Sequence, residues 1–260
     1  MGRIISFGIQ KGGVGKTTTS SITSYLLSKK YKVLAVDLDS QGNMTYFLSQ
    51  KNIYYFQGKT ILEAMKEKDA KKYIYPVHDN LHLLGAEDVL ITLNRYLYTE
   101  YKGRPHYLLQ ETLAPIKDDY DYIVIDLPPN LGDQTTNGLT ASDYTVIMLQ
   151  SDPFCYDALD RYMHYLHGVR DNRNPNLYLL GILTTMYSSQ ARLDQTILEK
   201  VQTEYSGVVF ESVIKRRSRI KEFSSMGITD RTKVDREALE PYQMFVDEMI
   251  ERIDKAEREV

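Results

Sequence analysis

A glycine-rich turn between two lysines, KGGVGKTT at residues 11–18, restricts the fold of this chain more than any other feature. An apolar run at residues 4–9 precedes the turn, and residues 18–29 carry apolar side chains on one helical face. We therefore predict a buried strand, a tight turn and a helix. At such a helix start, backbone N–H groups wrap a polyphosphate, and glycines allow positive φ and a close approach to the phosphates.

The side chains of this turn supply the other groups that a phosphate site needs. Lys16 is placed to reach the β- and γ-phosphates of a nucleotide, and the Thr17 hydroxyl is placed to ligate Mg²⁺. The alternative is a glycine-rich turn that binds nothing. Eight matching residues between a predicted strand and a predicted helix argue against it. The predicted nucleotide-binding residues of the turn are Lys11, Gly12, Gly13, Val14, Gly15, Lys16, Thr17 and Thr18.

The turn departs from the ordinary phosphate loop in a way that identifies a family. The ordinary pattern, G-x-x-x-x-G-K-[ST], needs glycine where Gln10 stands and requires no lysine at position 11. The pair Lys11 and Lys16 around GGVG resembles the deviant Walker A motif of the ParA/MinD ATPases. The resemblance spans residues 2–253 and is greatest to the short ParA/Soj type, without an N-terminal helix-turn-helix. It implies that Lys11 crosses a dimer interface to the partner's nucleotide.

Composition limits the other classes of function. The 260 residues suit one α/β domain, residues 1–260, and 42% apolar with 26% charged residues is ordinary for a soluble protein. A net charge of −3 means that any DNA contact must come from a local basic patch. The single cysteine, Cys155, excludes an internal disulfide and the paired cysteine ligands of iron–sulfur relatives. We find no signal peptide or membrane-spanning run and expect a cytoplasmic protein.

Strand-like and helical runs alternate along the chain, which predicts an α/β fold. The expected architecture is that of a P-loop NTPase: a doubly wound, mostly parallel sheet with helices on both faces. Strands that are apolar throughout, such as residues 122–125, fit a sheet buried on both faces. Besides the first strand and helix, the predicted strands are 32–37, 81–84, 122–126, 144–149, 177–184 and 208–210, and the predicted helices 60–67, 107–116, 157–170, 193–205 and 237–259.

Two aspartates at strand ends complete the predicted phosphate site. Asp126 ends the run YIVID and looks like the Walker B residue, which holds the Mg²⁺ shell directly or through water. The segment DLDSQGN at residues 37–43 resembles the first switch of the family, in which the second aspartate, here Asp39, positions the attacking water. Asp37 is expected nearer the outer shell of the metal or the phosphate loop. Without the phosphate loop beside them, Asp39 and Asp126 would each be interpreted as a turn former or helix cap. The predicted metal ligands are Thr17, Asp39 and Asp126, and the predicted catalytic residues Lys11, Lys16 and Asp39.

The second switch of the family usually reads PPSLG followed by apolar residues. Here PPNLG is followed by Asp133 and Gln134, so this chain departs from the pattern. We expect this segment to change shape with the nucleotide state, and we assign Asp133 no catalytic role.

The family implies a base pocket made of Met186, Lys215 and Arg216. A competing signal is TKVD at residues 232–235, which matches the guanine-reading [NT]-K-x-D pattern of GTPases. The buried strand that this pattern needs is absent from the polar residues before it, so the match is interpreted as chance and ATP is favoured over GTP.

A basic cluster at residues 215–221 carries five basic side chains among seven residues. Such a cluster predicts salt-dependent contacts to DNA phosphates without sequence preference, and the family implies the same surface. The alternative is a solvated charged loop. The predicted DNA-binding residues are Arg192, Lys200, Arg216, Arg217, Arg219 and Lys221.

The C-terminal helix has an apolar stripe that includes Leu239, Phe245 and Ile253. The MinD branch uses a basic helix at this place to bind membranes. Here the polar face is net acidic, so anionic lipid would repel it. We expect the stripe to pack on the sheet and predict no membrane partner.

The resemblance implies an ATP-dependent homodimer that binds DNA without sequence preference and segregates plasmid or chromosomal DNA. Its cofactors would be ATP and Mg²⁺, its partner a ParB-like centromere-binding protein that stimulates slow hydrolysis, and its location the nucleoid. Two alternatives stay open: a MinD-like or cargo-positioning ATPase without a DNA role, and a small-molecule enzyme such as a dethiobiotin-synthetase-like ligase.

Overall fold

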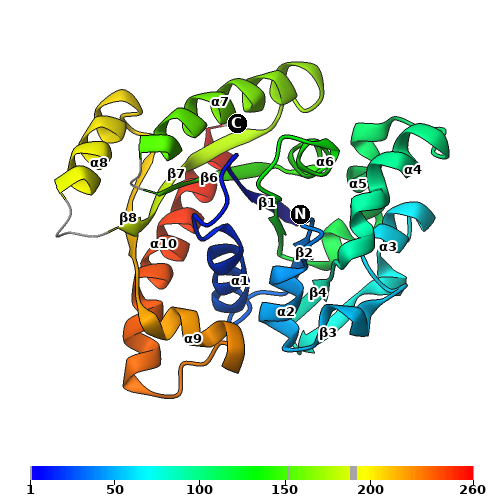
Figure 1. Cartoon of the computed structure of the whole chain (residues 1–260), viewed down its shortest axis with the longest axis horizontal. Helices are drawn as coiled ribbons and strands as arrows, with labels where there is room; N and C mark the ends of the chain where they lie inside the picture. Colours follow the sequence, from blue (N-terminus) through cyan, green and yellow to red (C-terminus); the bar gives the residue numbers. More distant parts are fainter. Residues whose placement is uncertain (1, 151–152, 188–191, 260) are drawn as a thin grey trace.

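In the computed structural model, eight strands form one sheet in the order β3-β4-β2-β5-β1-β6-β7-β8 (Figure 1). The structure describes residues 2–150, 153–187 and 192–259, without the side chains of 153–155 and 192–194. Every neighbouring pair is parallel except β3–β4, which is antiparallel. The strands are β1 (Arg3–Gly8), β2 (Val33–Asp37), β3 (Tyr75–His78), β4 (Leu81–Leu84), β5 (Tyr122–Asp126), β6 (Tyr144–Gln150), β7 (Tyr178–Tyr187) and β8 (Val209–Lys215).

The helices are numbered in chain order (Figure 1). They are α1 (Lys16–Leu27), α2 (Asn43–Ser49), α3 (Ile61–Glu67), α4 (Leu93–Thr99), α5 (Leu108–Leu113), α6 (Asp133–Ala141), α7 (Pro153–Asn172), α8 (Arg192–Glu204), α9 (Ser218–Met226) and α10 (Lys233–Arg258). Short 3₁₀ turns connect them: η1 (Ile53–Phe56), η2 (Lys71–Tyr73), η3 (Asp88–Thr92), η4 (Pro105–Tyr107) and η5 (Ala114–Asp119).

Helices cover both faces of the sheet. Phe7 in β1 packs edge-on against Phe245 of α10, with ring centroids 6.2 Å apart. A Cβ on the next residue, Gly8, would overlap the Tyr162 ring of α7. Because successive residues of a strand point to opposite faces, α10 and α7 lie on opposite sides. The helix α1 contacts α10, and α6 contacts α7. The predicted doubly wound α/β fold is therefore confirmed.

The central strands β2 and β5 consist mainly of apolar residues and are fully buried. Every residue of β2 and of β5 is buried, as expected when helices cover both faces. The strand β5 lies between β2 and β1 and is parallel to both, so the carboxyl ends of the three strands meet at one edge of the sheet. In open α/β sheets, ligands bind at this edge.

The predicted strands and helices are all present, with ends that differ by a few residues. The structure adds elements that the pattern did not predict: β3, α2, α4, α6 and α9. The helix α9 contains the second half of the basic cluster, residues 218–221, which the alternative reading of that cluster had taken as part of a loop.

The stripe of α10 packs as predicted. Leu239, Tyr242, Phe245, Met249 and Ile253 are buried, and the Phe245 ring lies 4.9 Å from that of Phe210 in β8. The helix is therefore part of the core. Within the described residues, no helix is both long and apolar enough to span a membrane.

Candidate nucleotide site

A cavity of about 1050 Å³ opens at the carboxyl ends of the strands. It brings together side chains that lie far apart in the sequence: the turn after β1, Asp39 after β2, Met186 in β7, and Lys215 with Arg216 where β8 ends. This is the arrangement that the sequence predicted. The lining also includes residues that the prediction missed, which come from α2, α9 and α10: Asn43, Tyr46, Phe47, Ile220, Ser224 and Tyr242.

The turn has the backbone of a phosphate-binding loop. Gly13 (φ 77°) and Gly15 (φ 82°) adopt the left-handed conformation that glycine tolerates, and α1 begins directly after Gly15. Val14 is buried, and its carbonyl accepts a hydrogen bond from the Thr185 hydroxyl at 2.7 Å. The last strands of the sheet thus hold the loop in place.

The two lysines of the turn have different surroundings. Lys16 is buried and lines the cavity, and its Nζ donates a 2.8 Å hydrogen bond to the Lys11 carbonyl. Lys11 is partly exposed and is not among the lining residues. A side chain placed beside the cavity is compatible with a reach toward a second subunit, which stays a prediction.

Gly12 offers a test that separates phosphate contact from folding. A Cβ at Gly12 or Gly13 would meet no atom within 4 Å, but only Gly13 has positive φ. We expect Gly13→Ala to lower the free energy of unfolding by about 1 kcal/mol and Gly12→Ala to change it by less than about 0.5 kcal/mol. Since Gly12 faces the cavity, Gly12→Ala should weaken ATP binding about tenfold, or ~1.4 kcal/mol. Thermal unfolding and ATP titration measure the two effects; unchanged ATP affinity of Gly12→Ala would place the phosphates elsewhere.

Two buried carboxylates lie behind the loop. Asp37 and Asp126 are paired residues of neighbouring strands, and both are fully buried. Burial raises the pKa of each carboxyl, and the Asp37 charge raises that of Asp126 further. The Thr17 hydroxyl, the Lys16 ammonium and the Ser20 hydroxyl act in the opposite direction on Asp126. A nearby cation would relieve the cost of this buried negative charge.

Asp126 is placed to serve a metal ion. One carboxylate oxygen, Oδ1, accepts a 3.1 Å hydrogen bond from the Ser20 hydroxyl, whereas Oδ2 is buried without a hydrogen-bond partner. In the described residues, no group of three or more His, Cys, Asp or Glu side chains could hold a metal. Mg²⁺ needs no such group, because it is usually held by one or two protein ligands together with nucleotide phosphates and water. Thr17 and Asp126 therefore fit Mg²⁺.

Asp37 has a structural role that the sequence did not predict, because its oxygens accept bonds within the protein; its place near the outer shell of the metal stays a prediction. Its Oδ2 accepts hydrogen bonds from the Thr45 backbone N–H (2.9 Å) and hydroxyl (2.8 Å), and its Oδ1 accepts one from the Asp39 N–H (3.1 Å). The Thr45 hydroxyl in turn accepts a bond from the N–H of Ala86. Asp37 thus ties the start of α2 to the ends of β2 and β4.

Asp39 lies in the cavity, where the sequence placed it. It is partly exposed, and its Oδ1 accepts the N–H of Gln41 at 3.0 Å, which closes a tight turn. Gly42 follows with φ 61°, and a Cβ there would come within 2.8 Å of Ile53 and the Ala86 carbonyl. The first switch is therefore held by the turn at Asp39 and by the close packing at Gly42, and the bond to Gln41 orients the Asp39 carboxylate. Its assignment as a metal ligand stays a prediction.

The residues predicted for the base pocket, Met186, Lys215 and Arg216, all line the cavity, and their contact with the base stays a prediction. Met186 has φ 54°, a strained conformation for a residue other than glycine, and its methyl group would lie 3.3 Å from a Cβ on Gly15. The motif TKVD is not part of this cavity. Thr232 and Asp235 instead form a capping box at the start of α10, as expected for a chance match to the guanine pattern.

The predicted DNA-binding residues fall into two groups. Arg216, Arg217 and Lys221 are exposed, line the cavity, and form no ion pair with another described residue. Arg219 is instead bound to Asp235 and Glu222, at 2.7 and 2.6 Å, so its charge is already compensated. Lys200 lies over the Tyr156 ring, 3.9 Å from a Glu204 oxygen. The side chain of Arg192 lies outside the described residues.

The chain is similar in sequence and fold to known proteins. A family model described as an AAA domain matches residues 2–179. The chromosome partitioning protein ParA of Myxococcus xanthus is 34% identical over 239 residues, covering 87% of this chain and 80% of that protein. The chain belongs to the ParA/Soj family of ATPases. A putative plasmid partition protein from Borrelia burgdorferi, solved with AMPPNP, superposes with a TM-score of 0.81 at 26% identity, covering 98% of this chain and 100% of that one.

Cobyrinic acid a,c-diamide synthase from Mycobacterium smegmatis, solved with ADP and magnesium, also has a TM-score of 0.81, at 28% identity, over 95% of this chain and 93% of that one. As a member of the ParA/Soj family, this chain is an ATPase with ATP and Mg²⁺ as cofactors. Lys16, Thr17 and Asp126 are the residues whose geometry fits these cofactors.

Proposed function

We propose that this protein is a partition ATPase in which ATP and Mg²⁺ join two subunits and the dimer binds DNA without sequence preference. The observation that carries the proposal is the shared cavity: the exposed residues Arg216, Arg217 and Lys221 line the same pocket as Lys16 and Thr17. DNA affinity and nucleotide state can therefore be coupled through one surface. Lys11 contacts the partner's nucleotide, and hydrolysis separates the subunits and releases the DNA.

The relatives support the wider role. The Myxococcus xanthus and Borrelia burgdorferi proteins are named for chromosome and plasmid partition. By analogy, this chain moves plasmid or chromosomal DNA, acts at the nucleoid in the cytoplasm, and is stimulated by a ParB-like centromere-binding protein. The nucleotide-bound dimer is the state that engages both DNA and this partner.

DNA retention across a salt series tests the proposal. With ATP and Mg²⁺ present, the affinity for a duplex of arbitrary sequence should fall steeply as salt rises, because each phosphate contact releases counterions. For each of Arg217→Ala and Lys221→Ala, the plot of log K for DNA binding against log salt should become shallower, by about 1 in the magnitude of its slope. Lys71→Ala is a matched control, since this exposed lysine pairs with Asp119 away from the cavity. Because both tested side chains line the cavity, ATP affinity is measured in parallel.

A cargo-positioning ATPase without a DNA role is the second candidate. It is favoured by the compensated charges of Arg219 and Lys200, which reduce the predicted DNA surface. DNA binding that does not respond to salt, or that the two variants leave unchanged, would favour this candidate. If the purified protein hydrolyses ATP without a second substrate, this result would argue against a small-molecule ligase.

A further inference from the structure

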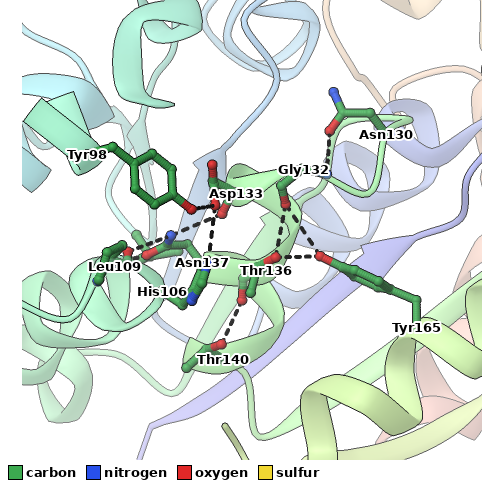
Figure 2. A network of polar contacts seen from close by, with 11 residues as sticks. Tyr98, His106, Leu109, Asn130, Gly132, Asp133, Thr136, Asn137, Thr140 and Tyr165 are labelled. Atoms are coloured by element: carbon green, nitrogen blue, oxygen red, sulfur yellow. Dashed lines mark hydrogen bonds and ion pairs between the residues drawn. The ribbon is translucent and has the colours of Figure 1, made fainter. Parts of the chain in front are cut away.

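The loop between Asp126 and α6, residues 127–132, is the second-switch segment of this chain, and a polar network fixes its far end (Figure 2). Its near end is fixed by β5, where the N–H of Leu127 donates to the Phe7 carbonyl at 3.2 Å. Between the two ends, Pro129 lines the nucleotide cavity. The position of this loop in the cavity therefore depends on what holds each end.

Asp133, the first residue of α6, is the centre of the far end. Its Oδ1 accepts a hydrogen bond from the Tyr98 hydroxyl at 2.8 Å and lies 3.2 Å from Nε2 of His106 (Figure 2). Tyr98 comes from α4 and His106 from η4, so two separate segments converge on one carboxylate oxygen. The side chains of His106 and Asp133 are 26% and 14% exposed. We call these three residues the Asp133 latch.

Neighbouring bonds tie the loop to the first turn of α6. The side chain of Asn130 accepts the N–H of Gly132 at 3.0 Å, and the Thr135 hydroxyl donates to the Asn130 carbonyl at 2.6 Å. Thr136 bonds both the Gly132 carbonyl and the Tyr165 hydroxyl of α7. A displacement of Asp133 is thus transmitted to residues 130–132.

Asn137 links α6 to η4 a second time and also links it to α5. Its Nδ2 donates to the carbonyls of Pro105 and Asp133, at 3.0 Å each, and its Oδ1 accepts the N–H of Leu109 at 3.1 Å. This link keeps the body of α6 in place if the latch is opened. Opening the latch therefore frees the first turn of α6 and the loop end bonded to it, while Asn137 keeps the rest of the helix in place.

We propose that Tyr98 and His106 are positioning residues for ATP turnover, which act by holding Asp133 and thereby fix the second-switch loop at the nucleotide. Neither residue lines the cavity, so neither touches the nucleotide. The loop contributes Pro129 beside the phosphate turn, whereas the phosphate turn itself is held by separate contacts. The latch therefore governs the rate of hydrolysis and leaves nucleotide affinity to the turn. The proposal concerns the ATPase reaction and does not depend on DNA binding.

Single variants of the full-length protein test the latch. Tyr98→Phe removes one donor, His106→Leu removes the other, and Asp133→Leu removes the acceptor. We expect the kcat for ATP to fall about threefold for each donor variant and about tenfold for Asp133→Leu, with the Kd for ATP within about twofold of wild type. His106→Gln is the matched control, because the glutamine amide can donate from nearly the position of Nε2 and should retain wild-type kcat.

Hydrogen exchange supplies a readout that does not depend on activity. The amides of residues 130–133 should exchange faster in Asp133→Leu, while those of the phosphate turn stay as in wild type. A wild-type kcat in all three variants would overturn the proposal, as would a loss in His106→Gln equal to that in His106→Leu. A rise in Kd without a change in kcat would also overturn it, because the latch would then serve ground-state binding.

Discussion

Replacing Lys16 with alanine should leave a folded protein whose affinity for ATP is at least about 100-fold lower, or ~2.7 kcal/mol. Lys16 is the buried ammonium group of the cavity, and it lies where α1 begins, among the N–H groups that face a polyphosphate. Its removal leaves the phosphate charge without its closest cation in a site of low solvent access. Charged partners in such sites contribute several kcal/mol when one of them is truncated.

The fold should survive this substitution. The Lys16 ammonium group donates to the Lys11 carbonyl, a bond within the same turn, and burying an ammonium group is itself costly. Titration with a fluorescent ATP analogue in the presence of Mg²⁺ measures the affinity, and thermal unfolding with and without ATP measures the linked stabilisation. At 100 times the Kd, ATP should stabilise the wild-type protein by about 2.7 kcal/mol and the variant hardly at all.

Lys30→Ala is the matched control, because Lys30 is exposed and follows the opposite end of the same helix. It should bind ATP like the wild type. If Lys16→Ala also did so, the phosphates would not lie in the turn at residues 11–18, and the assignment of the cavity as the nucleotide site would be wrong.

The sheet was predicted well from the sequence, and many residues predicted for the phosphate site line one cavity, because both predictions rest on local patterns. The apolar runs that became β1, β2 and β5 are short and continuous, and their carboxyl ends must meet in a parallel sheet. The sequence therefore predicted one site for Asp39, Lys16 and Met186, and all three line the same cavity. The conformation of the phosphate turn could be predicted because Gly13 and Gly15 permit the positive φ angles that it needs.

What the sequence did not predict depends on contacts between distant segments. The role of Asp37 depends on Thr45, which lies in α2, a seven-residue helix too short to show a clear period. The charge of Arg219 is compensated by Asp235, which is 16 residues away. The sequence indicated no contact for Asp235, which belongs to the TKVD motif. The Asp133 latch joins α4, η4 and α6, and sequence spacing gave no sign of it.

Replacing Asp39 with alanine should stop ATP turnover while leaving ATP binding intact. We expect kcat to fall at least about 100-fold, or ~2.7 kcal/mol, with the Kd for ATP changed less than about threefold. The carboxylate lies in the cavity but is not part of the phosphate turn, so it can act on the attacking water without carrying ground-state affinity. Single-turnover hydrolysis with Mg²⁺ and equilibrium ATP binding measure the two quantities.

Asp39→Asn separates the charge of this side chain from its structural role. In the wild type, Oδ1 accepts the N–H of Gln41, and an asparagine oxygen can accept the same bond. Asp39→Asn should therefore keep the turn and its thermal stability, whereas Asp39→Ala should lose about 1 kcal/mol of stability. Both variants should lose turnover if the negative charge polarises water. Normal hydrolysis by Asp39→Asn would mean that the turn, and not the charge, supports the reaction, and the catalytic assignment of Asp39 would then be wrong.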